Sequence, residues 1–270
     1  MSIVLHMSDT HFGTEKPAVV SALRALARER HPDVLVFSGD ITQRATPAEF
    51  TAARRLCDDM GITRMLALPG NHDLPLFDML SRLTRPYGNY LQAFGPRLEP
   101  RLDTDDFLVL GVNTTRPARH KNGEVSAEQV QRVARELQSA RPRQLRIVVT
   151  HQPAAVIRKE DEPDRLVGAE AALQAWSRAG ADLVLGGHIH LPYVLDLRAR
   201  PTPTPRPTWC VQAGTAVSSR VRHGTCNSVN LIHWLPMPFG QARKCQIERC
   251  DYSTAEGWFA TAELTTLALG

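Results

Sequence analysis

The chain has 270 residues, of which 43% are hydrophobic and 22% are charged, close to the average of globular proteins. This composition excludes a disordered or fibrous chain and supplies enough apolar side chains for a sizeable core. The formal net charge of +4 is too small to indicate a nucleic-acid or membrane-surface partner. No stretch approaches the roughly 18 apolar residues of a membrane helix, and the start of the chain lacks the pattern of a signal peptide. Five scattered cysteines indicate reduced thiols and a cytoplasmic location.

Strand and helix patterns alternate through the first two thirds of the chain. Short runs rich in Val, Ile and Leu predict strands that are buried on both faces, at 2–7, 34–37, 64–68, 107–112, 145–149 and 182–185. Apolar residues three and four apart predict helices at 17–30, after Thr46, after Ser126 and at 169–179. Thr46 and Ser126 each begin a capping box, with Glu49 and Gln129 as their partners. Strands that alternate with helices predict an α/β fold.

The pattern changes after residue 190. Apolar runs follow without long helices between them, at 193–197, 209–213, 228–235 and 244–249, and predict strands of a second sheet or of the far side of the same core. Alternate prolines in 198–207 predict a surface loop, with a lid or a subunit contact as the alternative. Residues 74–105 match neither the strand period nor the helix period. We expect one domain, 1–270, that includes these two irregular segments.

Polar side chains follow five of the predicted strands. They are two carboxylates, one amide and five imidazoles: Asp9, Asp40, Asn71, His11, His72, His151, His188 and His190. In open α/β sheets, ligands bind beyond the carboxyl ends of the strands, so we expect these groups to converge. Imidazole, carboxylate and amide ligands without cysteine indicate Fe, Mn, Zn or Co rather than a structural zinc site. Asp40 can give one oxygen to each of two metals, and such a pair can clamp a phosphoryl group.

In chain order, these residues form the motifs Asp9-x-His11, Gly39-Asp40, Gly70-Asn71-His72-Asp73, His151 and Gly187-His188-x-His190. The series resembles the signature of calcineurin-like metallophosphoesterases. Within that superfamily, the short chain is similar to class III cyclic-nucleotide phosphodiesterases and bacterial glycerophosphodiesterases. The resemblance implies a four-layer αββα sandwich of two packed mixed β-sheets flanked by helices. It also implies hydrolysis of a phosphodiester through attack by a metal-bound hydroxide.

The resemblance also implies a role for each residue and two divalent or trivalent metal ions, Fe, Mn or Zn. Asp9, His11 and His190 would hold the first ion, Asn71, His151 and His188 would hold the second, and Asp40 would bridge them. His72 would give a proton to the leaving oxygen or stabilise its developing charge. Asp73 would orient His72 from behind.

Other residues are candidates outside these motifs. Asn113 ends a predicted strand and either contacts substrate or pins a turn. Arg119 and His120 belong to a basic cluster, 116–121, which either attracts a phosphodiester or forms a solvated loop. Tyr87 and Tyr90 either stack on a base or pack within the protein.

The sequence favours a small-molecule phosphodiester as substrate, with a cyclic nucleotide such as 3',5'-cAMP first and a glycerophosphodiester second. A phosphomonoesterase or a pyrophosphatase on the same site is the first alternative, and a non-catalytic scaffold is the second. The small net charge gives little support to a nuclease. A homo-oligomer is left open.

Overall fold

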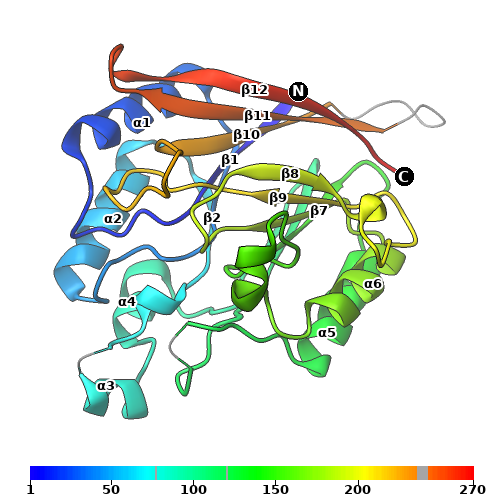
Figure 1. The fold of residues 1–270 in the computed structure, drawn as a ribbon, viewed down its shortest axis with the longest axis horizontal. Coiled ribbons are helices and arrows are strands. Elements are labelled where there is room, and N and C mark those ends of the chain that lie inside the picture. Colours follow the sequence, from blue (N-terminus) through cyan, green and yellow to red (C-terminus); the bar gives the residue numbers. More distant parts are fainter. Residues whose placement is uncertain (77, 120, 236–242) are drawn as a thin grey trace.

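Two six-stranded mixed sheets pack face to face in the computed structural model, which describes residues 1–76, 78–119, 121–235 and 243–270 (Figure 1). The first sheet runs in the order β12 (Trp258–Ala268), β11 (Lys244–Ser253), β10 (Ser228–Trp234), β1 (Ser2–Met7), β2 (Val34–Phe37), β3 (Arg64–Ala67). The second runs in the order β4 (Arg101–Asp103), β5 (Phe107–Gly111), β6 (Leu145–Val149), β7 (Leu183–Gly186), β9 (Trp209–Gln212), β8 (Tyr193–Asp196). β1, β2 and β3 are parallel, as are β5, β6, β7 and β9, and the other pairings are antiparallel.

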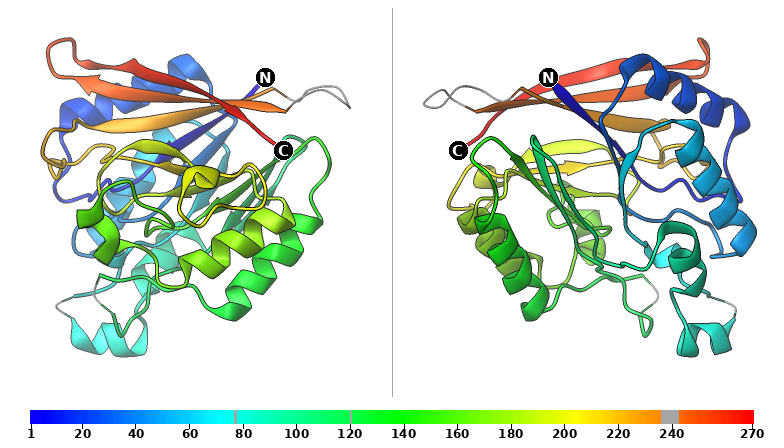
Figure 2. Two further views of the ribbon diagram at one scale, coloured as in Figure 1. Left: turned by 45° about the vertical axis from the view of Figure 1, so that its right-hand side comes forward. Right: turned by 180° about the vertical axis from the view of Figure 1, so that it is seen from behind.

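Helices cover the outer face of each sheet (Figure 2). The first sheet carries α1 (Pro17–Arg30), α2 (Pro47–Asp59) and α4 (Gly88–Phe94), and the second carries α5 (Ala127–Gln138) and α6 (Ala169–Ala179). Two separate apolar clusters join these helices to their sheets, one around Phe50 of α2 and one around Trp176 of α6. The expected four-layer αββα sandwich is therefore confirmed.

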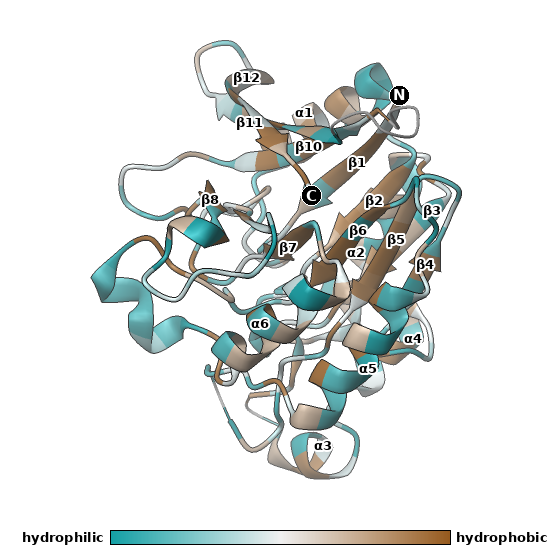
Figure 3. Cartoon of the chain, turned by 90° about the vertical axis from the view of Figure 1, so that its right-hand side faces the viewer, coloured by the Kyte–Doolittle hydropathy of each residue, from teal (hydrophilic) through white to brown (hydrophobic). Residues whose placement is uncertain are grey.

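A third apolar cluster fills the space between the two sheets. The alternation along β2 shows how the strands serve two cores: Val34 and Val36 face the opposite sheet, whereas Leu35 and Phe37 face the helices. Because successive side chains of a strand point to opposite faces, a strand between two apolar layers must be apolar at every position. Figure 3 shows the result as hydrophobic strands enclosed by helices with hydrophilic outer faces.

The predicted elements form, with ends that match or differ by one residue, except that the strand predicted at 244–249 continues to Ser253. Both capping boxes are present, at Thr46 and at Ser126. The strands after residue 190 divide between the sheets, since β8 and β9 join the second sheet whereas β10 and β11 extend the first. The sequence reading missed two edge strands, β4 and β12.

The two irregular segments have simple structures. Residues 74–105 contain α3 (Met79–Thr84), α4 and β4. The proline-rich segment 198–207 is a surface loop, as predicted, and it lies against α6, where Gln174 donates a hydrogen bond to the carbonyl of Pro203. Among the described residues, no helix is long and apolar enough to cross a membrane.

Candidate metal centre

The parallel strands of both sheets bring the predicted ligands to one rim. β1 and β2 are followed by Asp9, His11 and Asp40, and the two loops are tied together by the N–H of His11, which donates to the carbonyl of Asp40 (3.0 Å). β6 and β7 are tied in the same way, since the N–H of Gly187 donates to the carbonyl of His151 (2.9 Å). The fold thus places loops from five strands side by side, as the sequence predicted.

The backbone at the rim is strained. Seven described residues other than glycine have positive φ, and five of them are predicted ligands: Asp9, His11, Asp40, His188 and His190. Such left-handed conformations cost energy in residues other than glycine, and they are concentrated at functional sites. Close packing also requires glycine at two positions, because a Cβ at Gly70 would overlap Asp40 and one at Gly187 would overlap Ser8.

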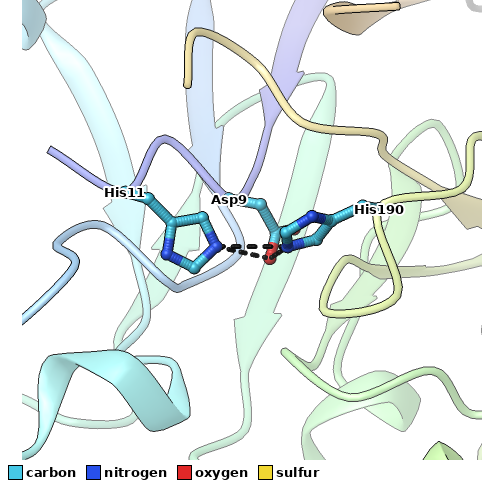
Figure 4. A group of neighbouring side chains, drawn as sticks. All are labelled: Asp9, His11 and His190. Carbon is cyan, nitrogen blue, oxygen red and sulfur yellow. Dashed lines mark hydrogen bonds and ion pairs between the residues drawn. The ribbon is translucent and has the colours of Figure 1, made fainter. Parts of the chain in front are cut away.

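The first cluster consists of Asp9, His11 and His190, whose ligand atoms point toward one another (Figure 4). Oδ1 of Asp9 lies 3.3 Å from Nε2 of His190 and 3.8 Å from Nε2 of His11. The Nδ1–H of His190 donates to the carbonyl of Arg220, which directs Nε2 toward the cluster.

The second cluster consists of Asp40, Asn71, His151 and His188. Nε2 of His151 lies 3.2 Å from Oδ1 of Asp40 and 3.2 Å from Oδ1 of Asn71, while its Nδ1–H donates to the carbonyl of Ser38 (2.8 Å). The ring of His188 is buried, and neither of its nitrogens has a hydrogen-bond partner among the described residues. A buried imidazole without a partner is costly in a protein interior, so this position fits a metal ligand.

Asp40 connects the two clusters. Its Oδ2 lies 3.7 Å from Nε2 of His11, and its Oδ1 faces His151. Burial alone would raise the pKa of Asp40, but the facing histidines, His151 foremost, hold it well below its usual range. Burial lowers the pKa of His11 to about 3 and, together with His151, that of His188 to about 4. An ionised carboxylate and neutral imidazoles are the forms that bind metal ions. Against the effect of burial, the charge of Asp40 raises the pKa of His151 to about 9, so an ion would have to displace a proton from that ring.

His72 lies close enough to His11 and Asp40 to form a third group of possible metal ligands, but its ring also has contacts of its own. Its ring is edge-on to His11, with 4.8 Å between ring centres, and its Nδ1–H donates to the carbonyl of Gln43 (3.1 Å). That contact leaves Nε2 toward the cleft, 3.2 Å from Nη1 of Arg220, and Nε2 has to carry a proton before it can give one to a leaving oxygen.

Among the described residues, no hydrogen bond joins the Asp73 carboxylate to the His72 ring, so the predicted orienting role has no direct contact behind it. The Asp73 carboxylate is buried and accepts hydrogen bonds from the N–H groups of Gly70, Ile41 and Thr42 and from the Thr42 hydroxyl, at 2.8–3.0 Å. It joins the loop after β2 to the loop after β3, while the carbonyl of Gln43 positions His72. Burial, followed by the charge of Asp40, raises the pKa of Asp73 to about 7.

Of the three tentative substrate contacts, the two that the structure describes do not line the cleft. Asn113 is buried, and its side-chain oxygen accepts hydrogen bonds from the N–H and hydroxyl of Thr115, so it pins a turn. Arg119 is paired with Glu124 at 2.9 Å on the surface. His120 lies outside the described residues.

Beside the ligands, the cleft is lined by Lys121 of the basic cluster 116–121 and by four charged residues that belong to none of the sequence motifs. The cleft has a volume of about 570 Å³, and the four residues are Asp161, Asp164, Arg220 and Arg222. The sequence did carry a signal for the two arginines. β9 is parallel to β7, so the loop that follows Gln212 reaches the same rim by the rule that located the metal ligands.

Comparison with known proteins agrees with this geometry. The family model described as calcineurin-like phosphoesterase matches residues 3–192, a range that contains all seven candidate metal ligands. The chain belongs to the calcineurin-like phosphoesterase family.

A curated relative matches only part of the chain. Glycerophosphodiester phosphodiesterase GpdQ of Enterobacter lignolyticus is 38% identical over 86 residues, a match that covers 26% of this chain and 29% of the relative. The matched part of the chain therefore covers less than a third of that relative's length.

Several solved structures share the fold of the phosphoesterase. A purple acid phosphatase from yellow lupin (Lupinus luteus) seeds has a TM-score of 0.67 at 12% identity, covering 99% of this chain and 53% of that one. A dimetal phosphatase from Danio rerio has a TM-score of 0.62 at 12% identity, covering 100% and 99%. Vacuolar Protein Sorting 29 from Cryptosporidium parvum has a TM-score of 0.52 at 13% identity, covering 99% and 98%. At such identities the likeness concerns the fold alone.

Proposed function

We propose that this phosphoesterase is a two-metal phosphodiesterase that hydrolyses a small diester. Asp9, His11 and His190 would hold one ion, Asn71, His151 and His188 would hold the other, and Asp40 would serve both. The observation that carries the assignment is the position of Asp40, whose two oxygens face His11 of one cluster and His151 of the other. When bound, two such ions polarise the phosphoryl oxygens and lower the pKa of water.

His72 acts on the leaving group in this proposal. Its ring is held from behind by the carbonyl of Gln43, and its backbone N–H donates to Oδ1 of Asp40 (2.8 Å). The ring is therefore fixed relative to the bridging carboxylate, which is the positioning that proton transfer requires.

The charge of the cleft favours a diester over a monoester. Arg222 is paired with Asp161 at 2.7 Å, and Lys121 is paired with Asp164 at 2.6 Å. Among the described lining residues, Arg220 alone is a cation without a carboxylate partner. A phosphodiester carries one negative charge, whereas a monoester carries about 1.5–2 at neutral pH. A cleft lining with little excess positive charge therefore suits the singly charged diester better than the monoester.

The cleft supports a small polar alcohol as the leaving group. No described lining residue is a Phe, Tyr or Trp that could stack on a base. Tyr90 is buried, with its hydroxyl donating to the carbonyl of Ala67, and the Tyr87 hydroxyl bonds to Thr115. The proposed substrate is therefore a glycerophosphodiester, with a cyclic nucleotide second, and the name of the relative GpdQ supports this order.

A substrate panel tests the proposal. The purified protein is reconstituted separately with Mn²⁺, Zn²⁺ and Fe²⁺ and assayed with glycerophosphodiesters, 3',5'-cAMP, pyrophosphate and a monoester and diester of p-nitrophenol. We expect two ions per chain and a higher kcat/KM for diesters than for the matched monoester. A preference for the monoester or pyrophosphate would contradict the proposed class, and two bound ions without any turnover would indicate the scaffold alternative.

A further inference from the structure

Arg220 occupies a place at the metal centre that none of the sequence motifs assigns. It lies on the loop after β9, and its half-buried side chain lines the cleft. Nη1 lies 2.9 Å from Oε1 of Gln43, 3.2 Å from Nε2 of His72 and 3.3 Å from Nδ1 of His11. The guanidinium is thus in contact with a candidate metal ligand and with the proposed proton donor.

Its surroundings differ from those of the other cations of the cleft. Arg222 and Lys121 are neutralised by Asp161 and Asp164, whereas Arg220 has only neutral or imidazole partners among the described residues. A half-buried cation held without an anion is stabilised when an anionic ligand arrives.

Metal binding would free part of the guanidinium for such a ligand. When Nε2 of His11 binds an ion, the proton of that ring is on Nδ1, and Nδ1 can no longer accept a hydrogen bond from Arg220. The planar guanidinium has five N–H donors, and their geometry matches the oxygens of a phosphoryl group.

We propose that Arg220 is a catalytic residue that binds a non-bridging phosphoryl oxygen beside His72. This inference rests on the proposed function, because it assumes that the phosphoryl group lies between the two metal clusters and His72. The main-chain carbonyl of Arg220, which accepts from Nδ1 of His190, has a separate positioning role. That role survives substitution of the side chain.

The test uses the manganese-loaded protein with the variants Arg220→Ala and Arg220→Lys. Arg54→Ala is the matched control, because Arg54 is a half-buried arginine of α2 that is paired with Asp58 at 2.9 Å. Calorimetry with inorganic phosphate measures ligand affinity without requiring turnover, and metal analysis measures the ions per chain.

We expect Arg220→Ala to keep two ions and to bind phosphate about 10–100-fold more weakly, the effect of losing a charge-assisted hydrogen bond. The kcat/KM of Arg220→Ala for a diester should fall by at least the same factor as its affinity for phosphate. Arg220→Lys should recover part of the loss, since it keeps the charge but not the planar fork, and added methylguanidine should partly restore Arg220→Ala. Arg54→Ala should match the wild type.

Unchanged phosphate affinity in Arg220→Ala, with both ions bound, would overturn the inference. It would also be overturned if Arg220→Ala had no effect on kcat/KM in a His72→Ala background, because Arg220 would then act only by holding His72. Weaker phosphate binding by Arg220→Ala in a protein that hydrolyses no diester would support the phosphate contact and refute the proposed function.

Discussion

Replacing Asp73 distinguishes two roles for this carboxylate. If it joins the loops after β2 and β3, Asp73→Ala leaves three buried N–H groups, those of Gly70, Ile41 and Thr42, without an acceptor. Each orphaned donor costs about 1–3 kcal/mol, and water that enters the new cavity recovers part of this. We expect the free energy of unfolding to fall by about 3–5 kcal/mol, a large part of the 5–15 kcal/mol typical of a domain.

The same change should weaken metal binding, because the two loops carry Asp40 and Asn71. Urea unfolding followed by circular dichroism measures the stability, and titration with Mn²⁺ measures the affinity. Asp73→Asn keeps one acceptor oxygen and should show a smaller loss of both. Asp182→Ala is the control, since Asp182 is equally buried and is paired with Arg243 away from the candidate ligands. The Asp182→Ala variant should have a lower free energy of unfolding and an unchanged affinity for Mn²⁺.

A different result would refute this reasoning. If Asp73→Ala kept its stability and its metal ions but lost kcat to the same extent as His72→Ala, the carboxylate would act through the His72 ring. In that case a double variant would be no slower than either single one.

Four further outcomes follow from the structure. Asp40→Ala should lose both metal ions and activity, measured by metal analysis and turnover, because its carboxylate faces both clusters. His72→Ala should keep its ions while kcat falls about 10²–10⁴-fold, less for a diester with a good leaving group, whereas His151→Ala should lose metal as well. Burial lowers the pKa of His6 to about 3, below its value of 6.5 in the unfolded chain, so the unfolded state binds the extra proton and stability falls as pH drops from about 6.5 toward 3. His6→Gln should reduce that slope by up to about 1.4 kcal/mol per pH unit in urea titrations. Cys226 should react first with a thiol reagent in the native protein, because the other four cysteines are buried.

Each of these outcomes has a clear contrary result. Retention of both ions by Asp40→Ala would refute the bridging role, and metal loss by His72→Ala equal to that of His151→Ala would make His72 a ligand. An unchanged pH slope in His6→Gln would show that His6 is not neutral in the folded state. Labelling of all five thiols at one rate would contradict their burial.

The sequence was sufficient to locate the candidate ligands and the elements that carry them. Strands such as Val34–Phe37 are apolar at every position, and helix starts such as Thr46 contain their own capping partners, so both signals are local. The ligands follow from one further rule, since residues after parallel strands meet at a common edge. Asp40 could therefore be placed next to His151 although the two are far apart in the chain.

The tertiary structure decided the contacts that depend on pairing between distant segments. β10 pairs with β1 in a register that joins Ser2 to Trp234, which no local pattern encodes, and this pairing sends the late strands to different sheets. The acceptor role of Asp73 required the backbone of another loop, that of Ile41 and Thr42.

Arg220 is an example within the site of a residue whose role depends on the tertiary structure. An arginine in a loop has no spacing that distinguishes it from the other arginines of the chain. Its closeness to His11 and His72 depends on β9 lying parallel beside β7, and that order of strands is set by packing across the whole sheet. Local sequence determined which side chains were available, and the pairing of distant strands determined which of them meet, because hydrogen bonds between strands join residues far apart in the chain.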